Sequence, residues 1–233
     1  MRTIRQLYGE TLAASDGEIG HIKDFYFNDQ QWAIRYVVVD TGSWLPGRQV
    51  LLSPHAFRSV DQKGNSLQVI LNRRQIENSP AIDSHKPVSR QYEEDYYRYY
   101  GWPSYWEGGG MWGVSGLPVS PWPYLMPDQT TTAGAPLSNG DDPHLRSTQA
   151  MNGYYIQTSD GSIGHLTDFV IADESWAIRQ LVIQTGHWFS AKEIVLLPED
   201  VDRISYEQST VYVSKTKEAI SAAPEYHVSP LDA

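Results

Sequence analysis

Three kinds of side chain that could take part in chemistry, an imidazole, a carboxylate and a guanidinium, occur twice in this sequence at the same spacing. The two sets are His21, Asp24 and Arg35, and, 144 positions later, His165, Asp168 and Arg179. A histidine near a carboxylate and an arginine could supply a general acid, an orienting group and an anion clamp. Two equivalent sites are therefore one interpretation of the pattern, and a repeated structural role is the other.

These polar residues lie within a longer internal repeat. Residues 15–54 recur at residues 159–198 without a gap, and 19 of the 40 aligned positions are identical. Repetition at a fixed offset is typical of one structural unit that is present twice. We expect a first unit at 1–82, a connecting segment at 83–150, a second unit at 151–226 and a C-terminal tail at 227–233.

Short apolar runs separated by turn residues predict that each unit is mainly β. The Asp-Gly pairs at 16–17 and 160–161 are hairpin signals, and the two WAIR segments continue as strands rich in β-branched residues. A short helix is expected at about 73–78 and again at about 217–222. The predicted fold is two small antiparallel β-barrels, each closed by a short helix and joined by a segment rich in aromatic residues and proline.

A hairpin in each unit predicts partners for the repeated Asp and Arg residues. If residues 28–31 form the hairpin loop, Asp24 lies opposite Arg35, and the equivalent register places Asp168 opposite Arg179. A cross-strand ion pair of this kind contributes about 0.2 to 1 kcal/mol, and a bulge near Asp24 would shift the register. We therefore expect two structural ion pairs and no catalytic residues, while the two repeated histidines stay unassigned.

Four motifs of the repeat are specific enough to suggest a family. The DG-x-IGH-x-x-DF strand, the WAIR strand, the VLL-x-P strand and the closing IENSP helix resemble the PRC-barrel family. This family includes the cytoplasmic domain of the photosynthetic reaction-centre H subunit and the C-terminal domain of a ribosome maturation factor. The resemblance implies two tandem PRC-barrels that pack against a protein partner, and it defines a fold more than an activity.

The segment between the repeats is unusually aromatic, since 11 of residues 92–124 are Tyr or Trp. These residue types dominate the hot spots of protein interfaces, whereas disordered linkers are poor in them. The candidate interaction surface comprises Tyr96, Tyr97, Tyr99, Tyr100, Trp102, Tyr105, Trp106 and Trp112. Two interpretations stay open: the side chains bind a partner or a second copy, or they pack against their own chain, because large apolar patches are uncommon on monomers.

The composition argues against several classes of function. The net charge of −10 disfavours nucleic acid and anionic lipid, whose phosphates an acidic surface repels. The sequence has no Cys, no His cluster at ligand spacing and no nucleotide-binding motif, so we expect neither a metal nor a cofactor. A chain without Cys fits a reducing cytoplasm, and no stretch approaches the roughly 18 apolar residues of a membrane span.

Repeated scaffold motifs without a complete catalytic set favour a soluble, non-enzymatic interaction or scaffold module. We expect a homodimer that binds a protein partner whose identity the sequence does not give. One alternative is a small-ligand or hydrolytic cleft between the two units, lined by His21, His165 and aromatic side chains of the connecting segment. Another, based on family resemblance only, is an accessory protein of a photosynthetic or other membrane complex.

Overall fold

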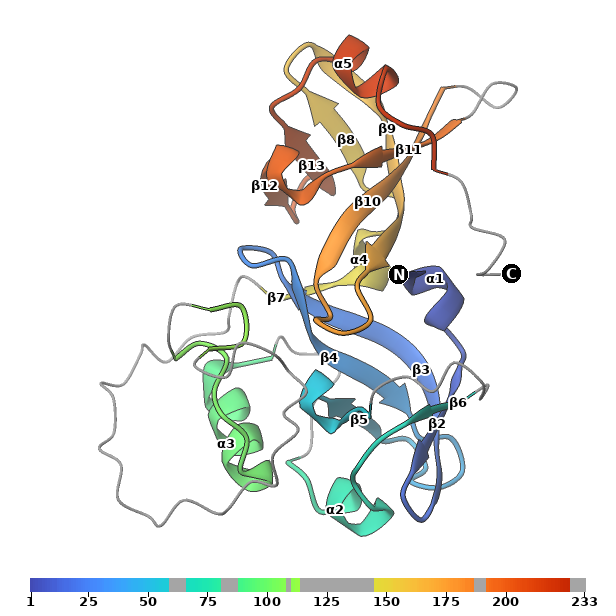
Figure 1. Ribbon diagram of the computed structural model, residues 1–233, viewed down its shortest axis with the longest axis vertical. Helices are drawn as coiled ribbons and strands as arrows, with labels where there is room; N and C mark the ends of the chain where they lie inside the picture. Colours follow the sequence, from blue (N-terminus) through green and yellow to red (C-terminus); the bar gives the residue numbers. More distant parts are fainter. Residues whose placement is uncertain (59–65, 81–87, 108–109, 114–144, 187–191, 227–233) are drawn as a thin grey trace. The chain divides into compact units, whose positions relative to one another are not determined.

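The protein is mainly β and contains two multi-stranded sheets (Figure 1). The computed structural model describes residues 1–58, 66–80, 88–107, 110–113, 145–186 and 192–226. The predicted C-terminal tail at 227–233 and most of the proline-rich part of the connecting segment lie outside the described residues. Among the described residues, no helix is both long and apolar enough to cross a membrane.

The chain divides into two compact units, and their boundaries differ from the expected ones. Unit 1 comprises Met1–Gly9, Asp24–Arg35 and Arg146–Ala233, while unit 2 comprises Glu10–Lys23 and Tyr36–Leu145. The N-terminal turn and the end of the first long hairpin thus belong with the second repeat. Neither unit is a single continuous stretch of sequence, and the expected division at 1–82 and 151–226 stays a prediction from the repeat.

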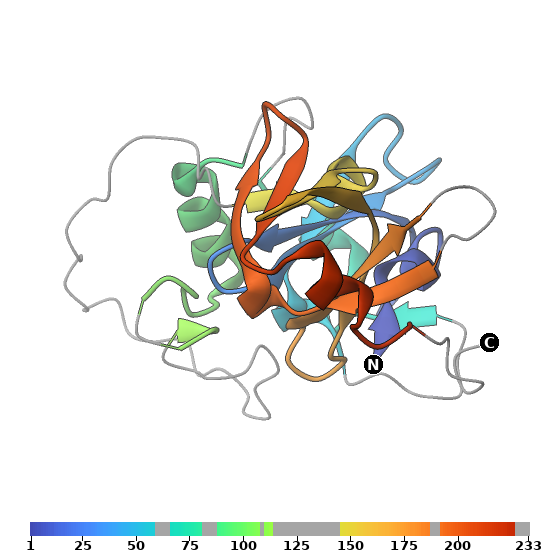
Figure 2. The same cartoon turned by 90° about the horizontal axis from the view of Figure 1, so that it is seen from above.

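The sheet of unit 1 has the strand order β11-β10-β9-β8-β13-β12, and β1 also pairs with β9. All of these pairs are antiparallel except β13 with β8. The hairpin of β12 and β13 is orange-red in Figure 2. The strands are β1 (Arg2–Thr3), β8 (Tyr155–Thr158), β9 (Gly161–Ile171), β10 (Ile178–Thr185), β11 (Lys192–Leu196), β12 (Val201–Ser205) and β13 (Thr210–Val213).

The second sheet has the order β5-β4-β3-β2-β6, with β7 also paired to β3. Its strands are β2 (Thr11–Ala14), β3 (Gly17–Asn28), β4 (Ala33–Asp40), β5 (Gln49–Leu52), β6 (Ser66–Gln68) and β7 (Leu145–Ser147). β2 pairs in parallel with β6, as β8 does with β13 at the matching place in the second repeat. β4 is buried from Ala33 to Val39, including the charged Arg35, which fits a run that is otherwise apolar.

Four short helices and one longer helix complete the described fold. The predicted closing helices are confirmed as α2 (Arg73–Glu77) and α5 (Lys217–Ser221), with Asn72 and Thr216 as their N-caps. The longer helix α3 (Arg90–Tyr100), green in Figure 1, ends at Gly101 in the left-handed conformation. The remaining two, α1 (Ile4–Leu7) and α4 (Thr148–Met151), are equivalent turns at the starts of the two repeats.

The repeated Asp-Gly turns fasten the closing helices. Asp16 Oδ1 accepts a hydrogen bond from the backbone N of Arg73 (2.8 Å), and Asp160 Oδ1 accepts one from the backbone N of Lys217 (2.9 Å). Each carboxylate therefore satisfies one of the free N–H groups in the first turn of its helix. The shared motif thus joins the start of the repeat to its end.

Gly20 has a steric role that no other residue type could fill. A Cβ at this position, where φ is +136°, would lie 2.0 Å from the carbonyl oxygen of Asp40. The second repeat keeps the same close approach, because a Cβ on Gly164 would lie 2.0 Å from the carbonyl oxygen of Gln184. The close packing of one strand against the next therefore explains why the IGH motif has a glycine in both repeats.

Candidate functional site

The repeated aspartates bind partners other than the repeated arginines. Asp168 lies opposite Val182 in the β9–β10 ladder, where the register shifts on either side, so it does not face Arg179. Asp24 instead accepts hydrogen bonds from Ser147 Oγ (2.5 Å), Thr148 Oγ1 (3.1 Å) and the backbone N of Gln149 (3.0 Å). The register shifts in the β9–β10 hairpin account for the displacement of Asp168 from Arg179.

Within unit 1, each aspartate caps a helical turn that comes from the other repeat. Asp24 of the first repeat binds the start of α4, and Asp168 of the second repeat accepts from the backbone N of Arg5 in α1 (3.1 Å). The Arg5 guanidinium also lies 3.8 Å from the Asp168 carboxylate. The two repeats therefore exchange caps, and the retained carboxylates have a structural function in unit 1.

Further contacts in unit 1 follow the same exchange between the repeats. Ala33 and Ala177, which are 144 positions apart, form an antiparallel bridge. The backbone N of Ile34 donates to the carbonyl of Trp176 (2.9 Å), and the backbone N of Ile178 donates to the carbonyl of Trp32 (2.7 Å). Equivalent positions of the two repeats thus meet in pairs within unit 1.

Burial is the largest influence on the pKa of both aspartates. It raises the pKa of Asp24 above its usual value, while the hydrogen bonds from Ser147, Gln149, Phe25 and Thr148 act in the opposite direction. Burial likewise raises the pKa of Asp168, against the hydrogen bonds from Phe169 and Arg5 and the charge of Arg5.

The repeated arginines and histidines occupy different environments. Arg35 is fully buried and donates to the Gln31 side chain, whereas Arg179 is exposed beside a bulge. His21 is exposed, with Nδ1 3.3 Å from Thr11 Oγ1, and His165 is half-buried in unit 1. Each histidine belongs to its own unit, and a cleft lined by both stays a prediction.

Four members of the candidate interaction surface are not on the surface. Tyr96, Tyr97, Tyr105 and Trp112 are 2 % exposed or less, which fits the alternative that these four pack against their own chain. They pack inside unit 2, where ring contacts join them to one another and to the buried His55. Of the remaining four, Tyr99 is the most exposed at 43 %, and Tyr100, Trp102 and Trp106 are half-buried.

A buried carboxylate organises this aromatic cluster, and the sequence analysis did not identify it. Glu93 of α3 is fully buried, accepts hydrogen bonds from Tyr36 Oη and Tyr105 Oη (both 2.8 Å) and pairs with Arg90 (2.9 Å). Burial, followed by the charge of Glu93, raises the pKa of Tyr36 well above its ordinary value. The cluster is fixed by hydrogen bonds to a charged group, which makes it part of the structure of unit 2.

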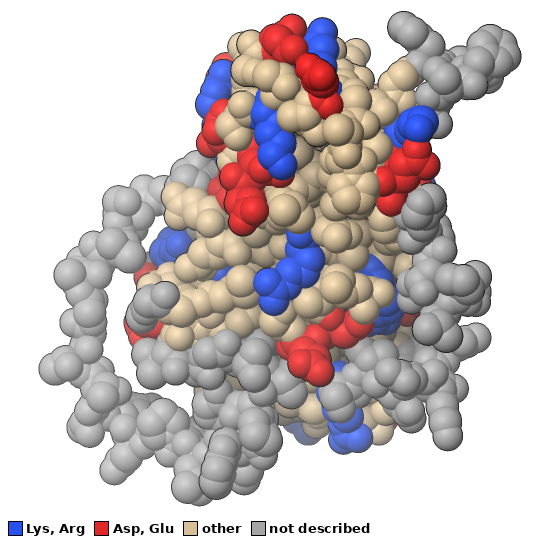
Figure 3. All heavy atoms as spheres, turned by 45° about the horizontal axis from the view of Figure 1, so that its top comes forward, with Lys and Arg blue, Asp and Glu red and all other residues tan. Residues whose placement is uncertain are grey.

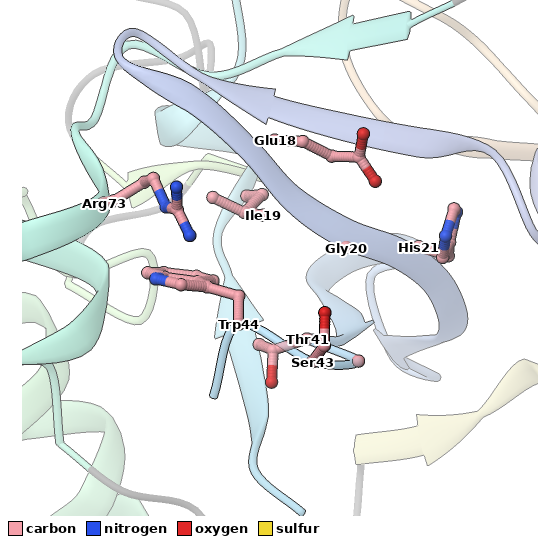
Figure 4. Close-up of a pocket in the computed structure, with 9 residues that line it drawn as sticks. Glu18, Ile19, Gly20, His21, Thr41, Ser43, Trp44 and Arg73 are labelled. Atoms are coloured by element: carbon pink, nitrogen blue, oxygen red, sulfur yellow. The ribbon is translucent and has the colours of Figure 1, made fainter. Parts of the chain in front are cut away.

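A polar pocket in unit 2 is the best candidate for a functional site (Figure 4). Its volume of about 580 Å³ falls within the roughly 300 to 1,000 Å³ that small-ligand sites occupy. Three segments build it: the start of β3, the loop that follows β4 and the first residue of α2. The lining residues are Glu18, Ile19, Gly20, His21, Thr41, Gly42, Ser43, Trp44 and Arg73.

The pocket uses residues that the two repeats share. Six of its nine lining positions, including His21 and Trp44, carry the same residue type 144 positions later. Gly20, one of these shared positions, permits the close approach of β3 to Asp40 described above. The repetition of His21 together with Trp44 is the sequence pattern that could have indicated the pocket. The contribution of Arg73 depends on the tertiary fold.

Arg73 and Trp44 form the most defined part of the lining. The Arg73 guanidinium carbon lies 4.8 Å from the centre of the Trp44 ring, a distance that suits a cation–π contact. The backbone N of Arg73 is held by Asp16, so the start of the side chain has a fixed position. Its buried Nε has no hydrogen-bond partner among the described residues, and a guanidinium in this situation can receive an anionic group.

The lining groups of the pocket show how it could hold a ligand. Ser43 and His21 both line it, but no hydrogen bond joins them within the described part of the chain, as a nucleophile and its base would require. The described residues also include no group of three His, Cys, Asp or Glu side chains that could hold a metal ion. The groups that are present can orient a ligand through charge, hydroxyl groups and one indole ring.

Comparison with known proteins gave no identification. A scan against protein-family models gave no match, and a search of curated proteins gave no match either.

Proposed function

We propose that this protein is a non-enzymatic interaction or scaffold module built from two PRC-barrel-like repeats. The observation that carries the proposal is the exchange of caps in unit 1, where Asp24 and Asp168 bind turns from the opposite repeat. Groups that could have served acid–base chemistry are engaged in holding the two repeats together. A framework of this kind suits a protein that presents surfaces to a partner.

The face drawn in Figure 3 supports a protein partner over a polyanion. Among the described residues drawn there, basic and acidic side chains are interspersed. Nucleic acid binding needs basic residues gathered on one face. Exposed apolar side chains such as Tyr155 (62 %) and Ile70 (48 %) give places where a protein partner could gain contact area.

Affinity capture with single surface substitutions tests the interaction proposal. Deleting the aromatic segment would remove buried core of unit 2, so point changes at exposed positions are the better probes. We expect a stoichiometric partner, or a second copy seen by light scattering, that is retained with the wild type and lost in Tyr155→Asp or Ile70→Asp. Exposed Asp202→Asn serves as the control. A monomer that retains no stoichiometric partner under any condition tested would contradict the proposal.

A second candidate function, small-ligand binding, is favoured by the polar pocket of unit 2. Arg73, Trp44 and Glu18 place two opposite charges and an aromatic ring around one cavity. Calorimetric titration with small charged molecules tests this function directly. Binding that Trp44→Phe or Arg73→Gln weakens would support it, provided that both variants keep the circular dichroism spectrum of the wild type.

A further inference from the structure

The pocket of unit 2 contains two opposite charges that do not neutralise each other. Arg73 and Glu18 both line it, yet no ion pair joins them among the described residues. Figure 4 shows their side chains at separate places around the cavity. The other pocket-lining side chains are uncharged apart from the titratable His21, so this cation and this anion dominate the electrostatics inside it.

The surroundings of Arg73 differ from those of the other arginines described in unit 2 near α2 and α3. Arg48 donates to the carbonyls of Glu77 and Ser79, and Arg98 pairs with Asp95. Arg73, by contrast, contacts Trp44 through the face of its guanidinium, which leaves the N–H groups at the edge able to donate. A planar guanidinium with free edge donors matches the two oxygens of a carboxylate.

Glu18 limits which anions the pocket can accept. Its carboxylate is exposed at the rim, where it repels a ligand that carries only negative charge and attracts one with a positive group. The half-buried Trp44 ring adds an apolar portion to the lining. The Thr41 hydroxyl already donates to the backbone carbonyls of Leu45 and Arg48. The lining therefore offers complementary places for a carboxylate, an ammonium group and an apolar side chain.

We propose that the pocket binds a small zwitterion that carries both a carboxylate and an ammonium group, the chemistry of a free amino acid or a very short peptide. Arg73 receives the carboxylate, Glu18 faces the ammonium group, and the side chain of the ligand packs against the half-buried ring of Trp44. This inference rests on the small-ligand function proposed above, and it adds the ligand class to that function.

Calorimetric titration of the full chain with matched ligands tests the inference. The probes are a panel of free amino acids with small, aliphatic, aromatic, acidic and basic side chains. For the tightest binder, the amide removes the carboxylate charge and the N-acetyl derivative removes the ammonium group. Amide nitrogen NMR follows the indole N–H of Trp44, assigned with Trp44→Phe, so that binding is located in the pocket.

Three variants connect each charge of the ligand to one residue. We expect Arg73→Gln to weaken binding of the amino acid roughly tenfold or more and to abolish its preference over the amide, because one charged hydrogen-bond pair is removed. Glu18→Gln should abolish the preference over the N-acetyl derivative. Arg74→Gln, an exposed neighbour on the same helix that does not line the pocket, should bind as the wild type does.

The outcomes separate failure of the ligand class from failure of the site. Equal binding of the N-acetyl derivative would point to a peptide C-terminus or another simple carboxylate, and equal binding of the amide would point to an amine; either result overturns the zwitterion while the pocket remains a ligand site. If no member of the panel binds at millimolar concentration and the Trp44 signal does not move, both the inference and the small-ligand function are overturned.

Discussion

Replacing Asp24 is the most direct test of the exchanged caps in unit 1. The carboxylate accepts four hydrogen bonds, and two of the donors, the Thr148 hydroxyl and the Phe25 backbone N–H, belong to buried residues. Each buried donor left without an acceptor costs roughly 1 to 3 kcal/mol. We therefore expect Asp24→Ala to lower the free energy of unfolding by about 3 kcal/mol.

Asp24→Asn should be milder and should change how stability depends on pH. The amide keeps one acceptor oxygen, so the expected loss at neutral pH is about 1 kcal/mol. In the wild type, burial raises the pKa of Asp24 above the unfolded value of 3.8. Between these two values the folded state holds more protons than the unfolded state, so this group's contribution to stability is full below 3.8 and falls as pH rises through the folded pKa. The wild type should thus exceed Asp24→Asn most at low pH, and the difference should shrink through this window.

Urea unfolding followed by circular dichroism between pH 3.5 and roughly 8 measures both effects. Asp202→Asn, an exposed change on β12 of the same unit, is the matched control and should stay within about 0.5 kcal/mol of the wild type. Double-mutant cycles identify the partner: Asp24→Asn should couple to Ser147→Ala by about 0.5 kcal/mol or more. Larger coupling to Arg35→Met, or an Asp24→Ala variant as stable as the control, would refute the exchanged cap.

Three further substitutions test other parts of the structure. Gly20→Ala should destabilise unit 2 by more than about 3 kcal/mol, because its Cβ would strike a carbonyl at 2.0 Å; a thermal midpoint no lower than that of Gly42→Ala, where a Cβ meets nothing within 4 Å, would argue against this. Glu93→Gln should cost about 3 kcal/mol in urea unfolding, since Arg90 loses a buried partner, and an unchanged midpoint would speak against a structural role. Tyr8→Phe should cost about 1 kcal/mol through the lost bond to Thr148 (2.8 Å), and a value near zero would show that water replaces it.

Local features of the chain were predictable because they depend on neighbouring residues. The mainly β class followed from apolar runs and turn residues, and α2 and α5 followed from N-caps at Asn72 and Thr216. The pairing of residues across each hairpin was harder to predict, because one bulge shifts the register of every residue pair beyond it. That sensitivity is the reason Asp168 faces Val182 and not Arg179.

The composition of the aromatic segment did not decide whether its side chains are buried. Tyr and Trp suit both an interface and a core, so the sequence supported either interpretation. The decision depends on Glu93, whose carboxylate accepts two tyrosine hydroxyls inside unit 2. Sequence patterns place a charged residue of an amphipathic helix on the exposed face. The partners that bury Glu93 are Tyr36 on β4 and Tyr105 beyond the end of α3.

The sequence alone showed a repeat at a fixed offset of 144 positions, and it predicted a mainly β fold with the turns and the closing helices α2 and α5. These features follow from spacing along the chain, since hairpins, caps and strand periodicity involve residues only a few positions apart. Only the tertiary structure decided that the Asp168 carboxylate caps the turn at Arg5, 163 positions away. The same holds for the contact of Arg73 with Trp44 in one pocket. Contacts at such separation depend on how complete elements pack, and the pattern within each element does not contain that information.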